Sequence, residues 1–215
     1  MNIESELKLI NQKICHMFDL VQSACEKAFN YYLSNDKYDP ELVIDDDEIN
    51  EAERQIESLC MQILLRERLF ASDMRIVTAS LKLVEDLERI GDQAYDIKQM
   101  TDELKKVENK SKLEDVEKLI AMVEKMVTQA LKAYVETDAQ TAKELINNDD
   151  AVDSLFWNIT QKLINLDEKH TLKSSQVIYQ VFIVKYLERI ADQATNIGEW
   201  VEYIVNGFHK DKVII

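Results

Sequence analysis

The chain has 215 residues and carries 41 acidic against 26 basic side chains, which gives a formal net charge of −15. This charge repels phosphate backbones, and no basic stripe with interleaved aromatic residues offsets it, so direct nucleic-acid binding is not expected. Three glycines and one proline are typical of a nearly all-helical chain. The sequence lacks a signal peptide and a long apolar run, so we expect a cytoplasmic protein without direct membrane insertion.

Three segments of the first half have apolar residues at alternating spacings of three and four, as on the buried face of a helix. They predict helices at about 3–35, 41–68 and 73–106. The second helix is expected to begin after Asp39 and Pro40, because an N-cap candidate followed by proline is typical of a helix start.

The second half repeats this plan. Its apolar stripes lie within residues 113–134, 152–166 and 183–204. The helix carrying the middle stripe is expected to be preceded by a helix start at Thr137. Short connections make consecutive helices antiparallel neighbours, so we predict an all-α fold of six long helices in two tandem three-helix bundles. The expected units are residues 1–108 and 109–215.

An internal duplication underlies this plan. Residues 83–97 recur as residues 183–197, with nine of the fifteen positions identical. The identical positions include two acids, Glu88/Glu188 and Asp92/Asp192. Core packing does not require acids at these positions, so the duplicated segment is where a functional site is expected.

Oxygen-bearing side chains form a column on the third helix of each half. Glu88, Asp92 and Asp96 follow one another at intervals of four residues, so they share one helix face, directed away from the expected core. Each like-charged pair at this spacing destabilises a helix by about 0.2–0.5 kcal/mol. An ordinary solvated face would interleave lysine or arginine instead. The second half repeats the column at Glu188, Asp192 and Asn196.

A second acidic element lies on the preceding helix of each half. Asp46 with Asn50 matches Asp149 with Asp153. If the second and third helices of a bundle are antiparallel neighbours, each half brings four or five oxygen ligands together. Oxygen ligands suit hard cations such as Mg²⁺, Mn²⁺, Ca²⁺ or ferric iron and argue against a structural zinc site.

Two other functions stay open. The acidic face could be a solvated surface of a metal-independent helical adaptor. A ferritin-like di-iron carboxylate protein is the enzymatic alternative, but it requires inward-facing glutamates and a Glu-x-x-His element. None of His16, His170 and His209 has a glutamate three residues before it. With no nucleophile–histidine arrangement and no glycine-rich phosphate loop either, catalysis is not expected.

Arginine and tryptophan side chains near these elements are expected to have structural roles. Arg89 follows Glu85 by four residues, which predicts a helix-surface ion pair. Trp157 and Trp200 are expected to pack within or between the bundles.

The segments L-E-R-I-G-D-Q-A-Y-D-I (87–97) and L-E-R-I-A-D-Q-A-T-N-I (187–197) resemble the PhoU family of phosphate-transport accessory and regulatory proteins. Members of that family are two tandem three-helix bundles, with E-x-x-x-D-x-x-x-N on the third helix and D-x-x-x-D on the second helix of each. The resemblance spans essentially the whole chain. It implies a first metal site of Glu88, Asp92, Asp96, Asp46 and Asn50, and a second of Glu188, Asp192, Asn196, Asp149 and Asp153.

The chain departs from the family pattern at three positions. Asp96 stands where the family usually has asparagine, Asn50 where it usually has aspartate, and Ala191 where it usually has glycine. The first two changes exchange carboxylate and amide and leave the number of oxygen ligands unchanged. Some members bind multinuclear iron or zinc clusters on these faces and others carry no metal. The resemblance therefore implies iron or zinc as candidate cofactors, beside the magnesium and manganese that the oxygen ligands suit.

The resemblance implies a cytoplasmic regulator of phosphate homeostasis without catalysis. Such proteins report the state of the phosphate ABC transporter, through its nucleotide-binding subunit, to a membrane sensor histidine kinase. They keep the phosphate-starvation response, the Pho regulon, off when phosphate is plentiful. The implied partners are that subunit and that kinase, and a homodimer stays open beside a monomer. The acidic faces are expected to dock on basic partner surfaces in a salt-dependent manner.

Overall fold

The computed structural model describes residues 3–34, 38–44, 46–66, 68–107, 113–169, 171–209 and 212–213. The helices are α1 (Ile3–Leu33), α2 (Asp47–Arg66), α3 (Ala71–Lys106), α4 (Glu114–Glu136), α5 (Ala139–Ile146), α6 (Asp149–Glu168) and α7 (Ser174–Asn206). A short antiparallel hairpin of β1 (Phe208–His209) and β2 (Lys212–Val213) follows α7. The expected all-α fold is confirmed, with α5 and α6 together in the place of the expected fifth helix.

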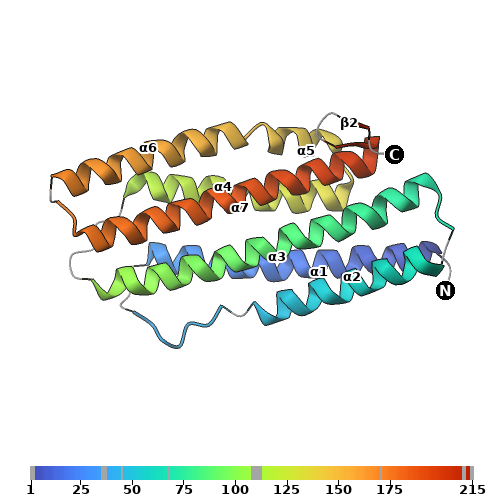
Figure 1. The fold of residues 1–215 in the computed structure, drawn as a ribbon, viewed down its shortest axis with the longest axis horizontal. Helices are drawn as coiled ribbons and strands as arrows, with labels where there is room; N and C mark the ends of the chain where they lie inside the picture. The colour runs from blue at the N-terminus through green and yellow to red at the C-terminus, as the bar shows by residue number, and fades with distance from the viewer. Residues whose placement is uncertain are drawn as a thin grey trace.

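The helices lie in two layers (Figure 1). The layer toward the viewer holds α6, α7, α3 and α2 side by side, each antiparallel to its neighbour, and α1 and α4 lie behind it. We call the outward side of the front layer the four-helix face. The first bundle is α1–α3 and the second is α4–α7, and the most extensive contact between helices is that of α3 with α7. No helix of the described residues is long and apolar enough to span a membrane.

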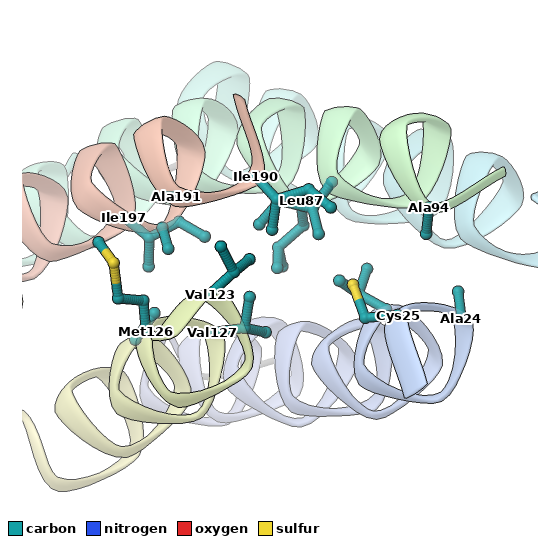
Figure 2. Packing of buried hydrophobic residues seen from close by; sticks show 14 of the residues in the cluster. Ala24, Cys25, Leu87, Ala94, Val123, Met126, Val127, Ile190, Ala191 and Ile197 are labelled. Carbon is teal, nitrogen blue, oxygen red and sulfur yellow. The ribbon is translucent and has the colours of Figure 1, made fainter. Parts of the chain in front are cut away.

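One hydrophobic core runs through both bundles. Leu87 of α3 and Ile190 of α7 lie across from Val123 and Val127 of α4 and from Cys25 of α1, and all five are buried (Figure 2). These residues belong to a single cluster to which both halves contribute. The alternating three- and four-residue spacing explains this core, because it puts one apolar stripe of every long helix between the two layers. The expected boundary between residues 108 and 109 lies outside the described residues and stays a prediction.

Two helices begin later than the sequence pattern predicts. The carboxylate of Asp39 accepts a hydrogen bond from the Glu41 backbone N–H at 2.9 Å, so it caps a turn, and α2 begins only at Asp47. In the second bundle Thr137 ends α4 in the left-handed conformation, with φ of 52°. Asp138 caps α5 instead, accepting from the Gln140 N–H at 2.9 Å. The predicted helix start at residue 41 is therefore wrong. A helix does begin near residue 137 as predicted, but its N-cap is Asp138 and not Thr137.

Helix α7 ends on a glycine in the left-handed conformation. Gly207 has a φ of 76° and its N–H donates to the Tyr203 carbonyl, as in a helix that ends on a left-handed glycine. The hairpin beyond it was not expected. It brings the His209 ring to 3.8 Å from the Trp200 ring, centroid to centroid, in a stacked arrangement.

Gly91 permits a close approach of α2 to α3. A Cβ atom at this position would lie 2.8 Å from the Cδ1 atom of Ile49. The equivalent positions of the second repeat are Ala191 and Val152, both buried. The second repeat thus has one more carbon on its third helix and one fewer on its second, which keeps the packed volume constant.

We predict that Gly91→Ala and Ile49→Val are energetically coupled. Alone, Gly91→Ala should change the free energy of unfolding little or lower it by about 1 kcal/mol, because overpacking opposes the higher helix propensity of alanine. In the Ile49→Val background, which lacks the Cδ1 atom, the same substitution should stabilise by about 1 kcal/mol. Urea unfolding of the two single variants and the double variant measures this coupling, and equal effects of Gly91→Ala in both backgrounds would contradict it.

Candidate metal centres

The paired acids of each repeat lie on the four-helix face. Asp92 is about 200° around α3 from the buried residues Ile90 and Ala94, so it points away from the core. Asp192 has the same position on α7. The expectation that these acids lie largely toward solvent is wrong. Glu188 is only 9% exposed, and the other acids of the two columns are half-buried, namely Glu88, Asp92, Asp96 and Asp192. The neighbouring helices α2 and α6 cover part of each stripe, because they pack against α3 and α7.

The second centre brings three carboxylates together between α6 and α7. One oxygen each of Asp153, Glu188 and Asp192 lies within 4.8 Å of the other two. Burial raises the pKa of Asp192 to about 6, and the charges of Glu188 and Asp149 add to the increase. The pKa of Asp149 is also raised by burial, although its carboxylate accepts a hydrogen bond from the Thr195 hydroxyl at 3.2 Å. Partly buried carboxylates that repel one another in this way gain most in stability when a cation binds to them.

One lysine lies at the edge of the second centre. The Lys185 Nζ atom is 2.5 Å from both carboxylate oxygens of Glu188. It also lies 5.2 Å from the centroid of the Phe156 ring. One carboxylate of this centre is therefore paired within the chain, which the sequence analysis did not anticipate.

The first centre is acidic but more open. Burial raises the pKa of Asp92, and the charges of Asp46 and Asp96 raise it further. The pKa of Glu88 is raised by burial and then by Asp92 and Asp46. Within the described ranges, no three carboxylates of this bundle approach one another as closely as those of the second centre. The Oδ1 atom of Asn50 is buried and has no hydrogen-bond partner among the described residues, so an acceptor is available there.

The first centre continues into acids that the sequence analysis missed. Burial raises the pKa of Glu53 to about 7, and Glu88, Glu57 and Glu85 increase it further. Glu53 and Glu57 continue the stripe of Asp46 and Asn50 along α2 at helical spacing. That spacing was visible in the sequence and could have identified them.

The third residue of each column turns toward the other repeat. Asp96 on α3 accepts a hydrogen bond from the Tyr186 hydroxyl, and the charge of Arg189 favours its ionised form, although burial raises its pKa. The Asn196 amide on α7 lies 3.5 Å from Asp86 Oδ1. Position 96 faces 186 as 196 faces 86, so the two contacts are related by the antiparallel pairing of α3 and α7. A ligand role for Asp96 and Asn196 stays a prediction.

Asp86 connects the two bundles. It is 6% exposed and accepts a hydrogen bond from the Trp200 indole Nε1 at 3.1 Å. Burial raises its pKa to about 6, although Trp200 and Arg89 lower it. The expected packing role of Trp200 is therefore confirmed. The same prediction is wrong for Trp157, because this residue is 60% exposed. The expected Arg89–Glu85 ion pair is confirmed.

The donors of both centres fit a hard cation. Each centre offers carboxylate oxygens, and the first adds the unpaired Asn50 oxygen. No histidine or cysteine takes part in the one close group of potential ligands within the described ranges. Oxygen-only donor sets of this kind suit Mg²⁺, Mn²⁺, Ca²⁺ or ferric iron better than zinc.

Both halves of the chain match the family model of the PhoU domain, over residues 14–101 and 116–201. The chain is 32% identical over 205 residues to the "Phosphate-specific transport system accessory protein PhoU homolog" of Pseudomonas aeruginosa, covering 94% of this chain and 85% of that protein. Identity to the homolog of Clostridium acetobutylicum is 29% over 210 residues, covering 97% and 96%.

Two solved structures are similar over nearly the full chain. The crystal structure of PhoU from Pseudomonas aeruginosa has a TM-score of 0.88 at 30% identity, covering 96% of this chain and 100% of that chain. The crystal structure of the phosphate transport system regulatory protein PhoU from Streptococcus pneumoniae has a TM-score of 0.87 at 26% identity and covers 100% of both chains. The similarity thus includes both bundles.

We predict that Glu53→Gln stabilises the metal-free protein above neutral pH. Because the folded-state pKa is raised to about 7, the folded chain holds a proton that the unfolded chain releases near pH 4.5, and wild-type stability falls as pH rises through this window. The variant should melt about 1–3 °C higher than wild type at pH 8, and the gain should disappear below pH 4.5. Thermal melts in EDTA across this pH range measure the difference.

Glu51→Gln is the matched control on the same helix. Hydrogen bonds from Gln55 and Arg54 lower the pKa of Glu51. The ionised Glu51 therefore contributes to the stability of the fold at neutral pH, and this contribution is lost on acidification. The control should therefore give no gain at pH 8. A Glu53→Gln gain that is independent of pH would contradict the electrostatic explanation.

Proposed function

The chain belongs to the PhoU family, and we propose on that basis that it is an accessory and regulatory protein of a phosphate-specific transport system. In this proposal it is a cytoplasmic negative regulator of phosphate uptake and of the phosphate-starvation response. It contacts the nucleotide-binding subunit of the phosphate ABC transporter and passes the state of the transporter to a sensor histidine kinase. We assign it no catalytic step.

The observation that supports this mechanism best is the duplicated acidic centre on one molecular face. The first centre lies between α2 and α3 and the second between α6 and α7, and these four helices form one layer (Figure 1). In both centres burial and neighbouring acids raise the pKa of the aspartates on the third helix, Asp92 and Asp192. Such carboxylates gain most when a positive group approaches, which favours basic partner surfaces.

The acidic centres are also the proposed sites of metal ions. The second would use Asp149, Asp153, Glu188 and Asp192, and the first Asp46, Asn50, Glu88 and Asp92, with Asp96 and Asn196 at the margin toward the other repeat. A hard cation would supply positive charge that offsets the repulsion among these oxygens. The carboxylates would determine how many protein oxygens bind the ion. Because they are partly buried, they would also limit the access of water to it.

A metal-independent adaptor is the second candidate. The pairing of Lys185 with Glu188 favours it, because an internal ammonium already compensates one acid of the second centre. In that version the same acidic face binds its partners directly. The ferritin-like di-iron enzyme has no such support, because the acids of both centres face away from the shared core.

We predict that neutralising both centres reduces partner binding. The quadruple variant with Glu88→Gln, Asp92→Asn, Glu188→Gln and Asp192→Asn should bind the nucleotide-binding subunit of the phosphate ABC transporter about tenfold more weakly at low salt, because it lacks charges that complement a basic surface. Its affinity should also depend less on salt concentration than that of wild type. Binding measured at two salt concentrations gives both quantities.

The control variant makes the same change in net charge, but on the back layer of helices. It replaces four exposed glutamates of α4 by glutamine, namely Glu114, Glu117, Glu124 and Glu136. If docking depends on total charge rather than on the four-helix face, the two quadruple variants will lose affinity equally. That result, or unchanged binding by the first variant, would contradict the proposed role of the acidic centres.

A further inference from the structure

The two repeats differ in charge at two positions next to their acidic centres. Position 85 on α3 corresponds to 185 on α7, and position 53 on α2 corresponds to 156 on α6. The first repeat has Glu85 and Glu53 there, whereas the second has Lys185 and Phe156. The duplicated centres thus share the acids Glu88/Glu188 and Asp92/Asp192. Beside them, the first repeat has two carboxylates where the second has an ammonium and an uncharged aromatic ring.

The Lys185 side chain is held by Glu188 of the second centre and by the neighbouring Phe156 ring. Its ammonium contacts both oxygens of Glu188 at 2.5 Å and approaches the Phe156 ring to 5.2 Å. The Glu188 side chain is only 11% exposed, so this carboxylate has little access to solvent cations from other directions. Glu188 is also one of the three carboxylates that lie within 4.8 Å of one another.

The lysine pairs with the same oxygens that a cation would require. A divalent ion bound to Asp153, Glu188 and Asp192 needs at least one Glu188 oxygen, and both are in contact with the ammonium. Two positive groups at one carboxylate repel each other. Cation binding therefore requires the Lys185 side chain to leave, together with loss of its contact with the aromatic ring.

The first repeat has a different arrangement at the corresponding place. Glu85 pairs with Lys82 at 3.1 Å and with Arg89. These cations are thereby held at Glu85 rather than on Glu88. Glu85 also adds a further negative charge close to Glu53 and Glu88, so the first centre has more carboxylates to be compensated by a cation.

We infer that Lys185 is a tethered counter-cation that competes with divalent metal ions for the second centre. The two centres are then inequivalent: the second exchanges an internal ammonium for a metal ion, whereas the first, with Glu85 at the same place, has no such exchange. This inference rests on the metal-binding part of the proposed function. It makes Lys185 a residue that sets the cation concentration at which the second centre is filled.

The test is calorimetric titration of EDTA-treated protein with MnCl₂. Lys185→Met keeps the aliphatic stem but removes the ammonium, and it should lower the Kd of one Mn²⁺ site about tenfold, since it removes both the pairing and the repulsion. Lys162→Met is the matched control: this exposed lysine of α6 pairs with Asp115 of α4, and its loss should change the Kd by about twofold or less. Adding Glu188→Gln to Lys185→Met should abolish the gain.

The reciprocal substitution tests the first centre independently. Glu85→Lys places an ammonium three residues before Glu88, as Lys185 precedes Glu188, and should raise the Kd of the other Mn²⁺ site about tenfold. Glu85→Gln, which removes the acid without adding a cation, should raise it less. Circular dichroism melts of every variant establish that the fold is retained, and this second substitution keeps the test decisive if Lys185→Met is unstable.

Each outcome has a defined meaning. Tighter Mn²⁺ binding by Lys185→Met than by wild type supports the inference. An additional Mn²⁺ site that is detected in Lys185→Met but not in wild type supports it as well. Equal affinity of wild type and Lys185→Met overturns the inference and leaves the proposed metal sites intact. Absence of Mn²⁺ binding by every variant overturns the inference together with the metal-binding part of the proposed function.

Discussion

The antiparallel packing of α3 against α7 is the constraint on which the rest of the structure depends. Each of these helices has one side in the shared core, one side against the other repeat and one side on the four-helix face. The apolar stripes fix the first side, and Asp86 with Trp200 and Asp96 with Tyr186 fix the second. The remaining side is where the acids lie, so the orientation of both centres follows from one helix–helix contact.

Partial burial gives these acids their chemical character. A carboxylate in open solvent has little need of a nearby cation, because water screens its charge. Asp192 is instead partly covered and close to other acids, and its pKa is raised to about 6. Covering by α2 and α6 thus turns a charged surface into two places where positive charge is stabilising, whether it comes from a metal ion, a partner or a lysine of the chain itself.

The helical fold was predictable from the sequence because apolar spacing reports directly on a buried helix face. The grouping of Asp153 with Glu188 and Asp192 was predictable as well, because it requires only that neighbouring helices be antiparallel. The pairing of Lys185 with Glu188 was not, because a lysine stem reaches in several directions and only the packed neighbours select one. The exposure of Trp157 has the same cause: periodicity gives the angle of a residue around its helix but not what covers it.

The late start of α2 and the break between α5 and α6 have a common consequence. Asp46 immediately precedes the first residue of α2, and Asp149 is the first residue of α6. The backbone N–H groups at the start of a helix together carry a partial positive charge of about half an elementary charge. Each acidic element therefore begins where the backbone itself attracts anions. Longer, uninterrupted helices would have placed these carboxylates in mid-helix, where the peptide dipoles offer no such compensation, so the two irregularities ease the crowding of negative charge that the face requires.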